Sequence, residues 1–297
     1  MPALLVLVAL ALLCLIWGVF IERHLYAIRS ENLAILPSGS KPIRILHIGD
    51  VHLAPWQRRK MRWISGLAER VKPDLVIDTG DNLGHRDAVG EFLAATEPLR
   101  RIPGAFVNGS NDYRAPGPTN PFTYFSAPTK ARDTAILDTD RLVSGLGQHG
   151  WLNLNNSGGR LMVNGLSVGL IGVDDQHIGR AHLGSLADSA ASTAGSDLLI
   201  GVTHAPYLDA IAAFGSAGVD LLLAGHTHGG QVCVPGYGAL VTNCDLPTKQ
   251  AKGLSRQAAN GREFWLNVVA GLGTSIYAPV RFFCRPEVRV LNLVARD

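Results

Sequence analysis

Cysteine and charge are both scarce in this chain. Its 297 residues include four cysteines, none in a C-x-x-C pair, and Cys14 lies far from Cys233, Cys244 and Cys284. Three cysteines in the main part of the chain do not indicate a disulfide framework, and the missing pairs argue against a closed thiolate metal site. Charged residues make up 17% of the chain, and the formal net charge is only +3. So weak a positive charge predicts no nucleic-acid partner.

Apolar residues are abundant instead, and many of them lie at the start of the chain. Hydrophobic residues make up 47% of the sequence, which excludes general disorder. Residues 3–21 carry no charge and would span about 28 Å as a helix at roughly 1.5 Å per residue. No basic region precedes this run and no small-residue cleavage site follows it, so we favour an uncleaved membrane anchor over a signal peptide. A buried core helix is disfavoured because the run is apolar on every face.

The charges that flank the apolar run predict its orientation. Four basic residues follow the run and none precedes it: Arg23, Arg29, Lys41 and Arg44. By the positive-inside rule, the main domain is expected in the cytoplasm of a single-pass cell-membrane protein. We expect an anchor over residues 1–22, a juxtamembrane linker over 23–42 and one domain over 43–297. Within the linker, residues 30–41 contain Pro, Gly and Ser and are predicted to form a loop. The sequence gives no oligomeric state.

The first half of the domain alternates strands with helices. Apolar runs at 43–48, 75–78 and 105–107 each end near a polar cluster that contains glycine, which is typical of a strand followed by a loop. Between them, 56–71 and 87–99 have apolar residues at helical spacing. This order predicts a layered α/β sheet with right-handed crossovers.

The second half contains more strands and fewer helices. Strands are predicted at 161–173, 198–203, 221–223, 264–269 and 288–294. Residues 187–196 form either a helix or a loop of small residues, and residues 116–121 are predicted to be a surface excursion. Together the two halves predict two packed sheets flanked by helices.

Residues of metal-binding type stand at the ends of five of these runs. The motifs are Asp50-Val51-His52, Gly80-Asp81-Asn82, Gly109-Ser110-Asn111-Asp112, Val202-Thr203-His204 and Gly225-His226-Thr227-His228. Each motif alone is weak, because a lone histidine after a strand is more often a hydrogen-bonded core residue. Together they are strong, because α/β sheets bind ligands in the loops beyond the carboxyl ends of their strands.

A bound cation explains this combination of side chains. Without one, the converging carboxylates would be desolvated against one another, which is costly. Mixed carboxylate, imidazole and amide donors suit Mn²⁺, Fe²⁺ or Fe³⁺, or Zn²⁺, and Asp81 could bridge two ions about 3.5–4 Å apart. We therefore predict two divalent metal ions as cofactors.

In this order the motifs resemble those of the calcineurin-like metallophosphoesterase superfamily, which carries D-x-H, G-D-x, G-N-H-D, G-x-x-H and G-H-x-H blocks. Residues 225–231, 243–247 and 271–287 look like the membrane-associated branch of YkuE-type phosphoesterases and LpxG-type UDP-diacylglucosamine pyrophosphatases. The resemblance implies an α/β fold, a four-layer α/β/β/α sandwich, here with an N-terminal transmembrane helix. It also implies two ligand sets: Asp50, His52, Asp81 and His228 for one ion, and Asp81, the third-block residue, His204 and His226 for the other.

The third block departs from the superfamily pattern. Ser110 stands where the pattern has the amide ligand, and Asn111 stands where it has the catalytic histidine. Either the loop is shifted so that Asn111 supplies its amide oxygen to the metal, or Ser110 is a weak ligand and Asn111 contacts the substrate. We prefer Asn111 as the ligand, because an amide oxygen is the better donor for a hard ion. The histidine acid is missing in both cases, which favours a leaving group that needs little protonation, such as a phosphate.

Other polar residues near these motifs have two interpretations each. Arg114 could pair with a substrate phosphate or be a solvated loop arginine. His85 could supply the missing acid or lie in a surface loop. The Asp174-Asp175 pair, with His177 nearby, could orient a ligand histidine or a substrate hydroxyl, or could simply start a turn.

Two further features concern the interior and the C-terminus. His47, inside the first predicted strand, is expected to be a packed residue or to support a ligand. Residues 277–285 alternate aromatic and cationic side chains and could lie at the lipid headgroup layer, or could form an ordinary final hairpin. The residues concerned are Tyr277, Arg281, Phe282, Phe283 and Arg285.

The sequence thus predicts a membrane-anchored, metal-dependent hydrolase of phosphoester or pyrophosphate bonds. Its partner would be a phosphorylated substrate, and the anchor favours a lipid-linked or headgroup phosphate. Asn111 and Asp112 are the candidate catalytic residues, with Asp112 expected to orient its own loop. Two alternatives stay open: a phosphodiesterase of soluble nucleotides, and a metal-binding scaffold that has lost turnover through the third-block changes.

Overall fold

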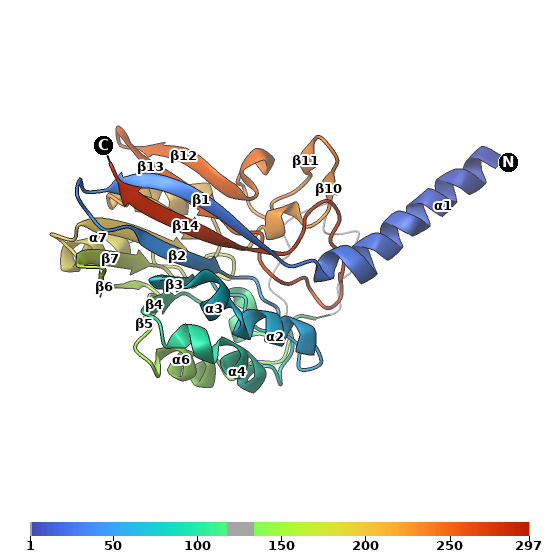
Figure 1. Ribbon diagram of the computed structural model, residues 1–297, viewed down its shortest axis with the longest axis horizontal. Coiled ribbons are helices and arrows are strands. Elements are labelled where there is room, and N and C mark those ends of the chain that lie inside the picture. The colour runs from blue at the N-terminus through green and yellow to red at the C-terminus, as the bar shows by residue number, and fades with distance from the viewer. Residues whose placement is uncertain (1, 118–133, 297) are drawn as a thin grey trace.

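Two six-stranded sheets and their flanking helices form the body of the protein, and one long helix projects from it (Figure 1). The computed structural model describes residues 2–117 and 134–296. The first sheet has the strand order β1 (Ala27–Leu36), β14 (Glu287–Ala295), β2 (Ile43–Ile48), β3 (Leu75–Asp78), β4 (Gly104–Phe106) and β5 (Leu152–Asn153). The second has the order β12 (Gly253–Ala259), β13 (Arg262–Val268), β9 (Leu221–Ala224), β8 (Leu198–Thr203), β7 (Leu166–Gly172) and β6 (Ser157–Val163).

Both sheets are mixed. Strands β2 to β5 run parallel to one another, as do β7, β8, β9 and β13. Antiparallel pairs form where β14 meets β2, β6 meets β7 and β12 meets β13. The parallel strands at the centre of each sheet place the loops that follow them at one edge of that sheet. These mixed sheets, covered by helices, confirm the predicted α/β class.

Helices cover the sheets, and three apolar clusters hold the layers together. The longer helices of the body are α2 (Arg58–Ser65), α3 (Leu67–Val71), α4 (Val89–Arg100), α6 (Thr139–Gly147), α7 (Ser185–Ser192) and α8 (Leu208–Ser216). One cluster joins α2, α3, α4 and α6 to the first sheet and includes Leu46 and Ile48. A second joins the two sheets and includes Ile45 and Ile200, and a third joins the second sheet to α7 and α8 through Phe214. Neighbours on β2 therefore face different clusters, as the period of two in a strand requires.

The predicted strands and helices of the first half are confirmed. The runs at 43–48 and 75–78 coincide with β2 and β3, and the run at 105–107 matches β4 within one residue. The helical segment 56–71 corresponds to α2 and α3, with a break at Gly66, and 87–99 corresponds to α4. The predicted β-α-β-α-β order is therefore present.

The second half requires one correction. The run at 198–203 coincides with β8, and the runs at 221–223, 264–269 and 288–294 match β9, β13 and β14 within two residues. Helix α7 shows that part of 187–196 is helical. The run 161–173 is not one strand but part of the hairpin β6–β7. Asn164 and Gly165 turn the chain there with φ of 51° and 89°, conformations that Asn-Gly pairs favour. Residues 118–121 of the predicted excursion lie outside the described residues.

The predicted loop at 30–41 is wrong for its first part. Residues 27–36 form β1, which pairs in parallel with β14. Leu33 and Ile35 are two residues apart, and both pack into the cluster between the sheets. The turn-forming composition of the segment applies only to the residues after Leu36.

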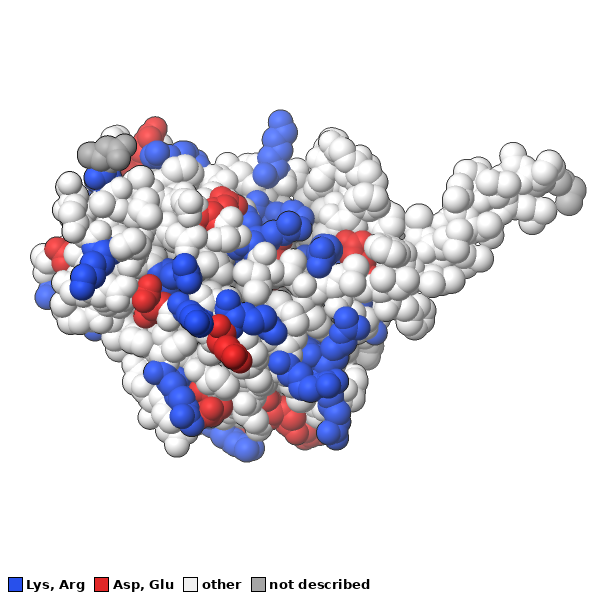
Figure 2. All heavy atoms as spheres, in the orientation of Figure 1, with Lys and Arg blue, Asp and Glu red and all other residues white. Residues whose placement is uncertain are grey.

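The N-terminal helix extends away from the body. It comprises α1 (Pro2–Ile16), a π-helical turn η1 (Trp17–Ile21) and a 3₁₀ turn η2 (Glu22–His24). None of the residues of α1 is buried, and in Figure 2 the visible face of the helix carries no charged side chain. Among the described residues, Pro2–His24 is the one helix long and apolar enough to cross a membrane by length and composition, with a mean hydropathy of 3.1.

Candidate metal centre

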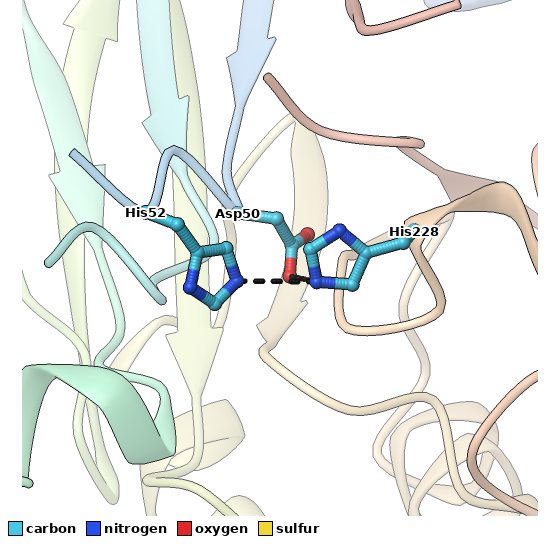
Figure 3. A group of neighbouring side chains, drawn as sticks. All are labelled: Asp50, His52 and His228. Atoms are coloured by element: carbon cyan, nitrogen blue, oxygen red, sulfur yellow. Dashed lines mark hydrogen bonds and ion pairs between the residues drawn. The ribbon is translucent and has the colours of Figure 1, made fainter. Parts of the chain in front are cut away.

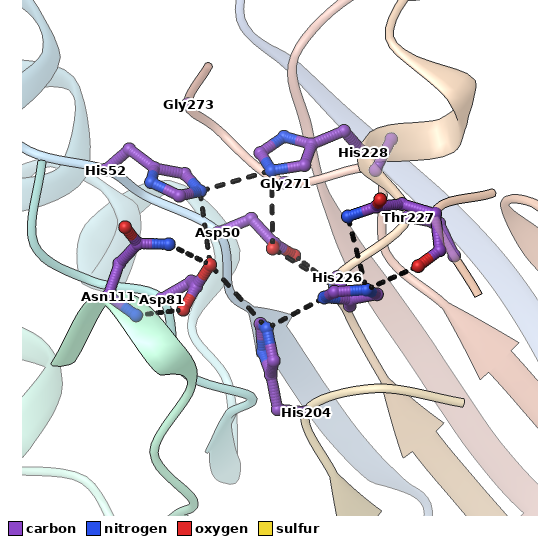
Figure 4. A network of polar contacts seen from close by, with 12 residues as sticks. Asp50, His52, Asp81, Asn111, His204, His226, Thr227, His228, Gly271 and Gly273 are labelled. Carbon is purple, nitrogen blue, oxygen red and sulfur yellow. Dashed lines mark hydrogen bonds and ion pairs between the residues drawn. The ribbon is translucent and has the colours of Figure 1, made fainter. Parts of the chain in front are cut away.

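The exit loops of both sheets meet at a single site. Asp50 and His52 follow β2, Asp81 follows β3, and Asn111 lies on the short helix α5 (Ser110–Tyr113) after β4. The second sheet supplies His204 after β8 and two histidines after β9. Figure 4 shows all seven predicted side chains turned toward one another: Asp50, His52, Asp81, Asn111, His204, His226 and His228.

Asp50, His52 and His228 form the first group of possible metal ligands (Figure 3). The Nε2 atoms of His52 and His228 are 3.1 Å apart, and Nε2 of His228 is 3.7 Å from Oδ1 of Asp50. Neighbouring ligands on an ion with bonds of about 2.1 Å are themselves separated by about 3 Å. The two imidazoles thus have the spacing of ligands aimed at one ion.

Asp50, Asp81 and His204 form the second group. Oδ2 of Asp81 lies 3.5 Å from Nε2 of His52 and 3.6 Å from Nε2 of His204. Asp81 therefore stands between a histidine of the first group and the histidine of the second. His226 joins the second group, because its Nδ1 is 3.3 Å from Nε2 of His204.

Backbone carbonyls determine which nitrogen of two histidines faces the site. Nδ1 of His204 donates to the carbonyl of Thr79 at 2.8 Å, and Nε2 of His226 donates to the carbonyl of Asn243 at 3.2 Å. A carbonyl oxygen can only accept a hydrogen bond, so in the neutral imidazole the other ring nitrogen of each histidine presents its lone pair inward. Metal-binding histidines are commonly held by this arrangement.

The electrostatics of the site favour positive charge. Burial raises the pKa of Asp50 to about 7. Burial acts in the same direction on Asp81, but His204 and His52 outweigh it and lower the pKa of that carboxyl. Burial also opposes the charge on His204, yet Asp81, Asp175 and Asp50 raise the pKa of His204 to about 9. The same carboxylates would stabilise a cation bound among them, as they stabilise the charged form of His204.

The remaining imidazoles are held neutral. Burial lowers the pKa of His52 to about 4 and that of His226 to about 3. Neutral imidazole is the form that binds metal. Within the described part of the chain, the buried Nδ1 of His52 has no hydrogen-bond partner. The donor set, its spacing and its charge therefore fit two divalent ions.

Five of these seven residues have left-handed backbone conformations. Their φ values are 47° at Asp50, 42° at His52, 55° at Asp81, 70° at His226 and 50° at His228. The left-handed region costs a residue with a Cβ roughly 1–2 kcal/mol. Such a concentration of strain is typical of functional sites, where the surrounding structure holds side chains in a required direction.

Glycines of the motifs make room for the carboxylates. A Cβ on Gly109 would lie 2.3 Å from Oδ1 of Asp81, and a Cβ on Gly225 would lie 2.5 Å from Oδ2 of Asp50. Both distances are well below contact distance. These two positions thus require glycine because a carboxylate packs directly on the backbone.

The third block brings Asn111, not Ser110, against Asp81. The backbone N–H and the side-chain Nδ2 of Asn111 donate to the two carboxylate oxygens of Asp81 at 2.8 and 2.7 Å. The carboxylate of Asp112 accepts from the backbone N–H groups of Asp81, Asn82 and Gly109 at 2.8–3.0 Å. Asp112 therefore joins two loops of the site, which agrees with its expected orienting role. The catalytic roles of both residues stay predictions.

Arg114 and His85 contact protein groups. Nη1 of Arg114 donates to the carbonyl of Thr134 at 3.0 Å, and its predicted contact with a substrate phosphate stays a prediction. Nδ1 of His85 is 3.5 Å from Oδ2 of Asp87, which is 72% exposed. This position agrees with the surface-loop interpretation of His85.

The residues after β7 approach the second group. Oδ1 of Asp175 accepts from the backbone N–H of His177 at 2.8 Å, and Nδ1 of His177 lies 2.9 Å from the hydroxyl of Tyr207. The ring centroid of His177 is 4.8 Å from that of His226. His177 therefore lies beside a candidate ligand, while an orienting role of the Asp174-Asp175 pair stays a prediction. Tyr207 belongs to none of the motifs, so no signal in the sequence identifies it.

His47 packs in the interior next to a residue that orients a candidate ligand, as predicted. It is fully buried, its Nδ1 accepts from Nδ2 of Asn267 at 2.8 Å, and its Nε2 lies 3.3 Å from the hydroxyl of Thr79. Thr79 is the residue whose carbonyl orients His204. His47 thus acts through a neighbour of the ligand.

Arg281 corrects the headgroup interpretation of residues 277–285, because its side chain is fully buried. Its guanidinium donates to the carbonyls of His228, Ala270 and Gly273 at 2.8, 2.7 and 2.6 Å. Arg281 therefore fixes the His228 loop against the loop after β13. Neither spacing nor composition could reveal this, because the partners lie far apart in sequence.

Known proteins resemble this chain over most of its length. A family model described as calcineurin-like phosphoesterase matches residues 43–230. The metallophosphoesterase YkuE of Bacillus subtilis is 24% identical over 92% of this chain and 87% of its own length. A metallophosphoesterase of Aquifex aeolicus is 26% identical over 93% of this chain and 95% of its own length.

Solved structures resemble it more distantly. The structure of NAD nucleotidase from Haemophilus influenzae has a TM-score of 0.44 and 11% identity over 78% of this chain. The chain spans about half of that protein, 51% of its length.

Proposed function

This chain belongs to the calcineurin-like phosphoesterase family and is a metal-dependent hydrolase of phosphoester bonds, and we propose that it cleaves pyrophosphate or activated phosphodiester bonds in lipid-linked substrates. One observation carries the proposed site. Asp81 places a single carboxylate oxygen within 3.5–3.6 Å of histidines from both ligand groups. A carboxylate in that position can serve two ions at once.

The distances support the assignment of the carboxylates and histidines as ligands, and Asn111 is assigned from the family blocks alone. We assign Asp50, His52, Asp81 and His228 to one ion, and Asp81, Asn111, His204 and His226 to the other. When bound, the two ions would neutralise the phosphoryl oxygens and lower the pKa of the attacking water. Mn²⁺, Fe²⁺ or Fe³⁺, and Zn²⁺ all suit this donor set.

The protein itself holds the parts in position. The carbonyls of Thr79 and Asn243 fix the rings of His204 and His226. The Asp112 carboxylate ties the Asp81 loop to the third-block loop. A site held by several hydrogen bonds to backbone groups needs little reorganisation during the reaction.

The third block supports the choice of bond. Asn111 stands where the family blocks hold a histidine, and an amide cannot donate a proton as an imidazolium does. General-acid help is typically worth about 10²–10⁴ in rate and matters least when the leaving group is itself a phosphate. A pyrophosphate or activated diester is therefore the favoured bond, and an unactivated alkyl phosphate is disfavoured.

The N-terminal helix supports a membrane location. We propose that Pro2–His24 anchors the chain in the cell membrane, with the main domain in the cytoplasm as the basic residues after the helix indicate. Similarity to YkuE agrees with the membrane-associated branch, and the three apolar clusters agree with a four-layer order of helix, sheet, sheet and helix. A reporter fused to the C-terminus tests the orientation: activity specific to the external side would contradict it.

Hydrolysis by the full chain in detergent tests the proposed site. After metal removal, we expect turnover of bis-p-nitrophenyl phosphate to return with Mn²⁺, Zn²⁺ or Mg²⁺. Asp81→Ala should abolish this turnover, while Asp87→Ala, which removes an exposed carboxylate, should retain it. Turnover that survives Asp81→Ala would refute the assigned site.

A comparison of substrates tests the proposed specificity. The same preparation is assayed with a lipid pyrophosphate in mixed micelles, a nucleoside diphosphate derivative and an alkyl phosphomonoester. We expect the highest kcat/KM for the lipid pyrophosphate. A preference for the nucleotide would favour the soluble-nucleotide alternative, and equal turnover of the alkyl phosphate would refute the leaving-group argument.

A further inference from the structure

A cavity next to the metal centre has no role in the proposed reaction. It has a volume of about 600 Å³ and lies between the hairpin of β10 (Cys233–Val234) and β11 (Gly238–Ala239), the 3₁₀ turn η5 (Thr248–Gln250) and the C-terminal loop. We call it the interfacial pocket and define it by the lining residues that matter here: Gly229, Val234, Tyr237, Lys249, Lys252 and Phe283.

The lining is cationic and apolar at once. Lys249 and Lys252 contribute two ammonium groups, and none of the described residues that line the cavity is Asp or Glu. Tyr237, Phe283 and Val234 are 73%, 56% and 43% exposed, although all three are large and apolar. Exposed apolar side chains gathered around cations suit a ligand that carries both an anionic group and a hydrocarbon part.

The same pocket is fixed to the foot of the N-terminal helix. The carboxylate of Glu22 accepts from the backbone N–H groups of Phe283 and Cys284 at 3.0 and 2.6 Å. The carbonyl of Gly18 accepts from the backbone N–H of Arg281 at 3.2 Å. The loop that supplies Phe283 to the pocket is therefore joined to the helix at two positions.

This connection fixes the position of the interfacial pocket relative to the proposed membrane helix. Figure 1 shows the β10–β11 hairpin beside the end of the helix nearest the body, and residues 233–239 of this hairpin include no charged residue. A helix that crosses the bilayer brings the residues at its foot to the headgroup layer. The exposed aromatic rings and the two lysines would then meet lipid headgroups.

We propose that the interfacial pocket binds the headgroup of an anionic phospholipid in the bilayer that holds the N-terminal helix. The lipid phosphate lies against Lys249 and Lys252, and the glycerol and first acyl carbons contact Tyr237 and Phe283. This proposal rests on the membrane anchorage proposed above. Because Gly229 lines the pocket and follows His228, a bound lipid would hold the catalytic loop at the membrane surface.

Lipid binding by the full chain in nonionic detergent micelles tests the proposal. Dioleoylphosphatidylglycerol is titrated and bound lipid is counted by native mass spectrometry, with dioleoylphosphatidylcholine and inorganic phosphate as comparison ligands. We expect one tight site for phosphatidylglycerol and binding of phosphatidylcholine at least tenfold weaker. The double variant Lys249→Gln/Lys252→Gln should bind phosphatidylglycerol about 30-fold more weakly, because each lysine near anionic lipid contributes about fivefold.

A matched variant controls for the loss of charge. Lys41→Gln/Lys72→Gln removes the same charge from lysines outside the pocket and should bind as the wild type does. Tyr237→Ser should weaken the binding of phosphatidylglycerol without creating affinity for inorganic phosphate.

Three results would overturn the proposal. They are equal binding of the two lipids, wild-type binding by the pocket variant, and displacement of phosphatidylglycerol by an equal concentration of inorganic phosphate, which would mark a free-anion site. Hydrolysis of bis-p-nitrophenyl phosphate is measured on the same samples. If hydrolysis persists while selective binding is absent, only this proposal fails; if binding persists while metal-dependent hydrolysis is absent, the proposed function fails.

Discussion

Substitution of Gly109 tests how tightly the third-block loop packs on the metal centre. Alanine at this position would place its Cβ 2.3 Å from Oδ1 of Asp81, 2.8 Å from the Asp81 nitrogen and 2.8 Å from Cε1 of His204. Carbon contacts shorter than 3.0 Å essentially do not occur, so the Asp81 carboxylate must move by at least 0.7 Å. The backbone of Gly109 has φ of −108°, which alanine adopts freely, so the effect is steric alone.

The magnitude follows from that displacement. Overpacking of this kind costs about 1–3 kcal/mol of stability. A misplacement of about 1 Å in a catalytic site can cost on the order of 10² in rate. We therefore expect Gly109→Ala to remain folded while its metal-dependent hydrolysis falls about 100-fold and its affinity for Mn²⁺ weakens.

A second glycine provides the control. Gly147, at the end of α6, has no atom within 4 Å of the position of an added Cβ. Gly147→Ala should keep wild-type activity and gain up to about 1 kcal/mol of stability from helix propensity. Hydrolysis of bis-p-nitrophenyl phosphate and thermal unfolding are measured for both variants. Full activity and wild-type metal affinity in Gly109→Ala would refute the packing described here.

Three further predictions concern the support of the site. Arg281→Lys loses several bonds to the His228 loop and should weaken Mn²⁺ binding about 10- to 100-fold in a metal titration; unchanged affinity would argue against a positioning role. Burial holds the pKa of His47 at about 3, below the 6.5 of the unfolded chain, so its contribution to stability is lost as pH falls below 6.5, by about 1.4 kcal/mol per unit. Denaturant titrations at pH 7 and pH 5 should show a smaller loss in His47→Gln, and an equal loss would contradict the assignment. Chelation should lower the Tm of the wild type but not that of Asp81→Ala, and equal shifts would place the stabilising ion elsewhere.

The sequence could predict the location of the site because the candidate metal ligands directly follow the ends of strands. Asp50 and Asp81 follow buried parallel strands of one sheet, and His204 and His226 follow those of the other. Parallel strands bring their carboxyl ends to one edge, so the motifs had to converge. Asn111 lies against Asp81, but it turns its amide nitrogen and not its oxygen toward that carboxylate, so the choice of Asn111 over Ser110 as a ligand stays a prediction.

What the sequence could not predict depends on distant partners or on backbone geometry. Strand β1 is stabilised by β14, whose first residue lies 260 positions along the chain from Ala27, so no local pattern reveals the pairing. Arg281 becomes a buried support only because the loops after β9 and β13 meet around its guanidinium. The left-handed conformations of Asp50 and His52 are imposed by that tertiary frame and oppose local preference.

Anomalous diffraction from crystals grown with Mn²⁺ would locate the bound ions. We expect two anomalous peaks about 3.5–4 Å apart on either side of the Asp81 carboxylate. One peak should lie among Asp50, His52 and His228, and the other beside His204. Both peaks should be absent from Asp81→Ala crystals or reduced to one. A single peak that does not contact Asp81, or peaks only on the protein surface, would contradict a two-metal site at Asp81.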